Sequence, residues 1–162
     1  MAQLLAAQDE TADLFTVRLN RQIAASPERI FDAWTDADAL AKWWGPKGFT
    51  NKSAAIDARP GGAFEITMVS PDGRETRMAG IVLELDRPRL IRLEIRHRQF
   101  EGAAEAPGGF IPTHVEIRPT EEAGGTRLDL THSGFLEAAQ PAGFTEGWQG
   151  SFDRLETLLA AA

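Results

Sequence analysis

Two of the three histidines in this chain follow apolar residues at strand spacing, where an imidazole could act as an acid, a base or a hydrogen-bonding group. His97 continues the alternation of Leu93 and Ile95. His132 continues that of Leu130, two residues earlier. Alternation therefore places both histidines on an inward, apolar face. Two interpretations are open: polar groups of a ligand pocket, or core histidines whose ring nitrogens are hydrogen-bonded to neighbours.

Other catalytic chemistry finds little support in the sequence. The absence of cysteine excludes disulfides, thiolate nucleophiles and Cys-ligated metals. A metal held by His97 and His132 would need a carboxylate such as Glu84, and we expect no metal and no cofactor. No serine lies in a nucleophile-elbow motif, and no glycine-rich segment has the lysine and spacing of a phosphate loop. We therefore name no catalytic residue from the sequence, and whether the protein is an enzyme stays open.

The segment Trp43-Trp44-Gly45-Pro46 is a candidate aromatic patch. Neighbouring residues of a helix point about 100° apart. We therefore expect only one of the two tryptophans to be fully buried, and we expect Trp44 to line the mouth of a pocket.

Two further polar residues are assigned structural roles. Arg59 could reach a ligand carboxylate, or it could have a structural role by pairing with Asp57 or capping the nearby short helix. The Gly-Gly turn that follows favours the structural role, because it indicates tight local geometry. His114 alternates with Val115 and is therefore expected to point outward, as a surface residue.

Periodic patterns predict the elements that must position these residues. Alternating apolar and polar residues predict strands at 14–23, 51–58, 63–69, 75–86, 89–99, 111–119 and 126–132. Between the first two strands, Ser26-Pro27 predicts the start of one helix and Thr35-Asp36 that of a second, which Gly45-Pro46 ends. A segment rich in Gly, Ala and Pro at 101–110 is expected to be a mobile loop.

A long amphipathic helix is predicted at 142–161. Its apolar stripe consists of Phe144, Trp148, Phe152, Leu155 and Leu159. A second stripe, about 120° around the helix, is made of glycines, namely Gly143, Gly147 and Gly150. Each glycine costs about 1 kcal/mol relative to alanine, so we expect the missing bulk to be used, either by a closely packed strand or by a ligand.

These elements predict an α+β helix-grip fold, in which a curved seven-stranded antiparallel sheet wraps around the long C-terminal helix and two short helices lie between the first and second strands. We expect an N-terminal tail at 1–12 and a single domain at 13–162. The net charge of −7 disfavours nucleic acid or an anionic membrane as the main partner, and no segment is apolar enough to insert into a membrane. Without a signal peptide, a cytoplasmic location is expected, and a homodimer is left open.

Several short motifs, taken in order, resemble one protein family. They are Ile30-Phe31-Asp32-Ala33-Trp34-Thr35-Asp36, Trp43-Trp44-Gly45-Pro46, Asp57-Ala58-Arg59-Pro60-Gly61-Gly62-Ala63-Phe64, Pro71-Asp72-Gly73 and Gly147-Trp148. Over residues 13–160 the chain resembles the SRPBCC superfamily and, within it, the family named after the activator of the heat-shock-protein ATPase. The resemblance implies a START-like, birch-pollen-allergen-like fold with a cavity between the sheet and the last helix. Relatives of this kind bind lipids, hormones or polyketides, and some are cyclases or hydrolases.

The sequence and the resemblance together predict a domain that binds a small hydrophobic or aromatic molecule between the sheet and the C-terminal helix. The pocket is expected to be lined by Trp44, Phe64, Met68, Met78, His97, Val115, Leu130, His132, Trp148 and Phe152. Two alternatives stay open: a cyclase- or hydrolase-type enzyme that uses the same pocket, and a co-chaperone-like protein-interaction module. The eukaryotic co-chaperone carries a further region for which this chain has no room, which disfavours a chaperone partner.

Overall fold

The computed structural model describes residues 16–100, 112–134 and 140–160, except for the side chains of 97–100 and 140–143. The tail expected at 1–12 and the loop expected at 101–110 lie outside the described residues. In chain order the elements are β1 (Val17–Ile23), α2 (Pro27–Thr35), α3 (Ala37–Trp43), β2 (Thr50–Ile56), β3 (Ala63–Val69), β4 (Glu75–Asp86), β5 (Leu90–Phe100), β6 (Thr113–Glu122), β7 (Gly125–Ser133) and α4 (Gln140–Ala160).

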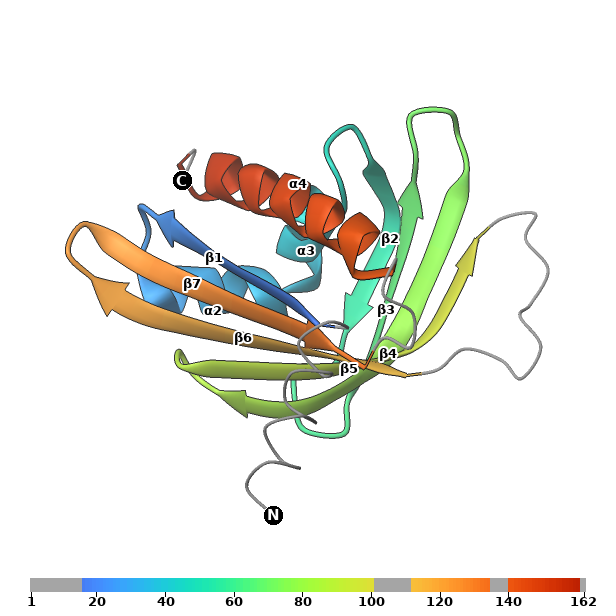
Figure 1. Ribbon diagram of the computed structural model, residues 1–162. Coiled ribbons are helices and arrows are strands. Elements are labelled where there is room, and N and C mark those ends of the chain that lie inside the picture. The colour runs from blue at the N-terminus through green and yellow to red at the C-terminus, as the bar shows by residue number, and fades with distance from the viewer. Residues whose placement is uncertain (1–15, 101–111, 135–139, 161–162) are drawn as a thin grey trace, which may run out of the picture.

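The seven strands form one antiparallel sheet in the order β1-β7-β6-β5-β4-β3-β2. This sheet is strongly curved, and α4 lies across its concave side together with the short helices α2 and α3 (Figure 1). Helix α4 packs against β1 and α3, and α3 covers β2. The arrangement confirms the predicted helix-grip fold, including the two short helices between the first and second strands. No described helix combines the length and hydropathy needed to cross a bilayer.

Local sequence signals explain where the short helices begin and end. The hydroxyl of Ser26 accepts a hydrogen bond from the backbone N–H of Arg29 at 3.2 Å, and α2 starts at the proline that follows the serine. The carboxylate of Asp36 caps α3 by accepting from the N–H of Ala39 at 3.0 Å. Beyond α3, Gly45 turns the chain with a φ of +99°, a left-handed conformation that favours glycine.

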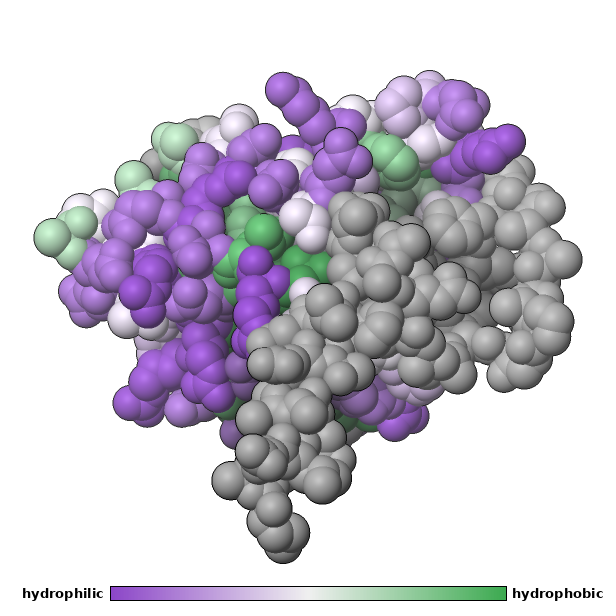
Figure 2. Space-filling view, viewed as in Figure 1, coloured by the Kyte–Doolittle hydropathy of each residue, from purple (hydrophilic) through white to green (hydrophobic). Residues whose placement is uncertain are grey.

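The register of the central strands aligns apolar side chains on the concave face. Ile91 of β5 lies opposite Ile117 of β6, which in turn lies opposite Leu130 of β7. Val115 lies opposite His132 in the same way. All five side chains are buried, because residues directly opposite each other in an antiparallel pair project from the same face of the sheet. Hydrophilic residues, by contrast, cover much of the described part of the surface in Figure 2.

Trp43 and Trp44 are both buried, so the expectation that only one of them would be is wrong. Their exposed fractions are 0% and 4%. The helical spacing between neighbours does not apply here, because α3 ends at Trp43 and the backbone of Trp44 is extended, with a ψ of 138°. The indole N–H of Trp43 donates to the carbonyl of Ala33 at 2.8 Å, which ties α3 to α2.

Candidate functional site

The candidate site is the apolar interior between the concave face of the sheet and α4. The structure brings the predicted hydrophobic lining residues into one buried cluster, made of Trp44, Phe64, Met68, Met78, Val115, Leu130, Trp148 and Phe152. They come from β3, β4, β6, β7, α4 and the residue after α3, so the site is assembled from segments that are distant in sequence. Their role in binding a ligand stays a prediction.

All four tryptophans of the chain meet in this cluster. The ring centroid of Trp34 lies 4.7, 5.9 and 5.7 Å from those of Trp43, Trp44 and Trp148, respectively. Trp148 stacks on Trp34 with an interplanar angle of 24°, and its centroid lies 5.3 Å from that of Trp44 in an edge-to-face contact. Aromatic pairs of this kind contribute about 0.5–1.5 kcal/mol beyond the area they bury, so the cluster holds α4 against the short helices.

His132 is a fully buried histidine whose two ring nitrogens are both hydrogen-bonded. Trp148 donates its indole N–H to Nδ1 at 3.1 Å, and Nε2 lies 2.9 Å from the hydroxyl of Thr113. Because an indole nitrogen only donates, Nδ1 carries no proton; Nε2 of the neutral ring then carries it and donates to Thr113. The ring of Phe144 meets the imidazole edge to face at 4.8 Å. These contacts support the interpretation of His132 as a core histidine.

The position of His97 is described only through its backbone. The pairing of β4 with β5 shifts register beside it, so that His97 lies opposite Ala79 whereas Ile95 lies opposite Gly80. The side chain of His97 is outside the described residues, and its inward orientation stays a prediction. Among the side chains that are described, no group of three or more His, Asp or Glu residues is arranged to hold a metal ion.

The structural roles expected for Arg59 and His114 are confirmed. The Nε of Arg59 donates to the carboxylate of Asp57 at 2.7 Å. The side chain of His114 is 48% exposed, and its Nε2 lies 3.0 Å from the carboxylate of Glu94. The pKa of Glu94 lies below its ordinary value because Arg96 and, secondarily, His114 hydrogen-bond to its carboxylate. Both residues therefore belong to the outer, charged layer of the protein rather than to the interior site.

Two buried polar atoms near the short helices have no hydrogen-bond partner among the described residues. One is the indole nitrogen of Trp34, a residue only 1% exposed. The other is Oδ1 of Asn51, whose amide nitrogen donates to the carbonyls of Ala41 and Trp44 at 2.9 Å each. An unsatisfied buried group of this kind costs about 1–3 kcal/mol. Sequence reasoning missed both atoms, because residue type alone does not distinguish a paired indole from an unpaired one.

The glycines of α4 make room for the chain that follows α3. A Cβ atom on Gly150 would lie 2.8 Å from the backbone nitrogen of Lys47 and 3.3 Å from Cα of Pro46. A Cβ on Gly147 would lie 3.7 Å from Cγ of Pro46. The bulk missing at Gly150 is therefore used by a loop, which corrects the expectation of a strand or a ligand there. The surroundings of Gly143 lie outside the described residues.

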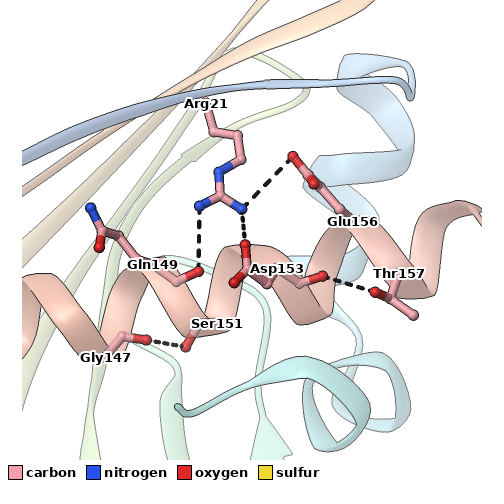
Figure 3. A network of polar contacts seen from close by, with 7 residues as sticks. All are labelled: Arg21, Gly147, Gln149, Ser151, Asp153, Glu156 and Thr157. Atoms are coloured by element: carbon pink, nitrogen blue, oxygen red, sulfur yellow. Dashed lines mark hydrogen bonds and ion pairs between the residues drawn. The ribbon is translucent and has the colours of Figure 1, made fainter. Parts of the chain in front are cut away.

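Two arginines that hold α4 in place were not identified from the sequence. Arg21 of β1 pairs with Asp153 and Glu156 and donates to the carbonyl of Gln149, as Figure 3 shows. Arg154 donates to the carbonyls of residues 42, 44, 45 and 46 around the end of α3, at distances of 2.7–3.4 Å. Burial lowers the pKa of its guanidinium. These partners are 108 to 135 positions away in the chain, which is why no local sequence pattern predicts them.

The fold and its interior define a class of protein. A curved antiparallel sheet that grips a long C-terminal helix, with two short helices after the first strand, is the helix-grip architecture of the SRPBCC superfamily. The family model described as "Activator of Hsp90 ATPase homolog 1-like protein" matches residues 24–160. The chain therefore belongs to this family, as the sequence motifs indicated. No match was found among curated proteins.

Solved structures agree with this assignment. A crystal structure of a protein from Chromobacterium violaceum is 32% identical, with a TM-score of 0.77 over 89% of this chain and 96% of that one. The AHSA1 protein of Silicibacter pomeroyi is 25% identical, with a TM-score of 0.74 over 90% of this chain and 98% of that one. A protein from Mycobacterium smegmatis is 25% identical, with a TM-score of 0.73 over 93% and 94% of the two chains.

Proposed function

We propose that this protein binds a small, largely hydrophobic or aromatic molecule in the interior between the sheet and α4. The observation that carries the proposal is the buried indole N–H of Trp34, which lacks a hydrogen-bond acceptor among the described residues. A ligand that places an acceptor there would relieve the cost of an unsatisfied donor, about 1–3 kcal/mol. The apolar cluster around Trp34 suits the rest of such a molecule.

The two buried atoms without a partner indicate which polar groups such a ligand would carry. The indole N–H of Trp34 would donate to an acceptor such as a carbonyl or ether oxygen, and Oδ1 of Asn51 would accept from a donor. The proposal does not need a hydrogen bond from the ligand to His132, because both ring nitrogens are already hydrogen-bonded, to Trp148 and Thr113. We therefore favour an aromatic or alicyclic molecule that carries at least one acceptor and few charges.

The contacts of His132 also bear on the alternative of a cyclase or hydrolase. A general base must accept a proton at a free nitrogen, whereas Nδ1 of His132 already accepts from Trp148. Catalysis by His132 would first require this buried bond to break. The name of the family refers to activation of the Hsp90 ATPase, so a protein-interaction role is the outcome we would favour if the interior binds no small molecule.

The test uses prodan, a neutral naphthalene with a ketone acceptor whose emission reports the polarity around it. We expect prodan to bind the native protein saturably and to quench the fluorescence of the buried tryptophans. Trp34→Phe keeps an aromatic ring but removes the N–H, and it should raise the Kd about two- to tenfold, the effect of one hydrogen bond. The matched control is Trp43→Phe in the same cluster, because the N–H of Trp43 already bonds Ala33 and the Kd should change little.

Two results would contradict the proposal. A natively folded wild type that shows no saturable prodan binding would overturn the small-molecule function itself. Equal affinities of wild type and Trp34→Phe would overturn the role of the Trp34 N–H. Near-ultraviolet circular dichroism of each variant shows whether the aromatic cluster stays packed, so a loss of binding is not confused with a loss of structure.

A further inference from the structure

Most lysine and arginine side chains that the structure describes pair with a carboxylate, but three such side chains near the end of α3 do not. Arg77 and Glu65, 2.7 Å apart, are typical of the paired majority. Lys42, Lys47 and Arg154 have no carboxylate within 4.0 Å among the described residues. This local surplus of positive charge contrasts with the net charge of −7 of the whole chain.

Two of these cations line an open groove of about 360 Å³ between α3 and α4. Its walls are formed by Lys42, Asp153, Arg154, Thr157 and Leu158. The two terminal nitrogens of Arg154 donate to carbonyls at the end of α3. A guanidinium has five N–H donors, and the Nε–H of Arg154 makes no hydrogen bond to a described residue. The groove thus contains a partly buried cation that retains a donor.

The groove carries more positive than unpaired negative charge, which favours binding of an anion. Asp153, the acid that lines it, is already paired with Arg21 from the β1 side (Figure 3). The backbone nitrogen of Lys47 is the atom nearest to a Cβ built on Gly150, which lies about one helical turn before Arg154. The backbone of Lys47 is therefore close to this turn of α4. Lys42 and Arg154 thus bring positive charge to a groove whose own acid is already paired.

We propose that this groove binds the oxyanion group, a carboxylate or a phosphate, of a small molecule. Lys42 supplies a point charge, and Arg154 supplies an N–H whose direction is held by its bonds to the α3 carbonyls. Leu158, which is packed against the core, offers an apolar wall for the rest of the molecule. The groove opens to solvent between two helices, so the proposal does not depend on ligand binding in the interior.

The test is a titration of ¹⁵N-labelled protein with inorganic phosphate and, separately, with hexanoate, at an ionic strength held constant with chloride. We expect saturable shifts of the amide signals of Lys42 and Lys47 and of the Nε–H signal of Arg154. Lys42→Gln should raise the Kd about two- to fivefold, the range for one exposed charge contact. Lys42→Gln combined with Lys47→Gln should raise it further. Arg154 is left unchanged, because it also holds the end of α3.

The matched control is Lys52→Gln, which removes the remaining lysine. Its ammonium pairs with Glu75 at 3.2 Å, so the Kd should not change. An equal loss of affinity in Lys52→Gln and Lys42→Gln would show a general charge effect and overturn the proposal, as would the absence of saturable shifts with both probes. Saturable binding of phosphate alone would assign a phosphoryl group, and binding of hexanoate alone a carboxylate with an apolar tail; either supports the site.

Discussion

The indole N–H of Trp148 donates to Nδ1 of His132 across 3.1 Å, and this bond joins α4 to β7 inside the core. Nε2 of the same imidazole reaches the hydroxyl of Thr113 on β6, so three elements meet at one ring. Because His132 is fully buried, water cannot replace these bonds without opening the structure. The histidine therefore sets the position of the last helix over the sheet.

Replacing His132 should destabilise the protein measurably. His132→Leu leaves the N–H of Trp148 and the hydroxyl of Thr113 without this partner, so the free energy of unfolding should fall by about 1–3 kcal/mol. Urea unfolding of His132→Leu, Trp148→Phe and the double variant measures the coupling between the two residues. We expect non-additivity of about 0.5–3 kcal/mol, the range for groups in direct contact. Strictly additive effects would show that the bond does not contribute to stability.

Trp34→Ala should destabilise far more than His114→Ala. Trp34 touches the three other tryptophans and is buried, whereas His114 is half-exposed on the outer face of the sheet. Truncating a buried aromatic residue costs about 3–5 kcal/mol, and surface changes usually stay within about 0.5 kcal/mol. Urea midpoints of the two variants provide the comparison, and similar shifts would contradict the placement of Trp34 at the centre of the cluster.

Alanine should have opposite effects at the two glycines of α4. At Gly147 the new Cβ meets one proline carbon at ordinary contact distance, so the variant should gain up to about 1 kcal/mol of helix propensity. At Gly150 it meets the backbone nitrogen of Lys47 at 2.8 Å, and overpacking should cost about 1–3 kcal/mol. Thermal midpoints should rise for Gly147→Ala and fall for Gly150→Ala. A rise in the thermal midpoint of both variants would mean that the backbone at Pro46 and Lys47 moves aside at little cost.

The contribution of Glu94 to stability should depend on pH. Hydrogen bonds from Arg96 and His114 lower the pKa of its carboxyl below the ordinary value of 4.5. A lowered folded-state pKa contributes stability above that ordinary value, and the contribution is lost as the pH falls through the folded-state pKa. Glu94→Gln should therefore be less stable than wild type at about pH 7, and this difference should shrink as the pH is lowered below 4.5. Urea unfolding across this pH range tests the prediction, and a pH-independent difference would contradict it.

Interactions between close neighbours in the chain explain why the elements were predictable. Ser26 and Asp36 cap the helices that they precede, and alternation correctly placed Val115 and His132 on the concave face. Each of these features depends on φ and ψ preferences or on residues a few positions apart. The family motifs then identified the fold, because their order and spacing reflect the order of these elements.

The amino-acid sequence by itself determined the strands, the capped helices, the apolar faces and the family. Only the tertiary structure decided that Trp44 is buried beside Trp43, that a loop occupies the space at Gly150, and that Trp148 bonds His132. The partners of Arg154 were likewise set by folding. The physical reason is that such contacts join segments far apart in the chain, so their geometry exists only once the sheet has curved around α4.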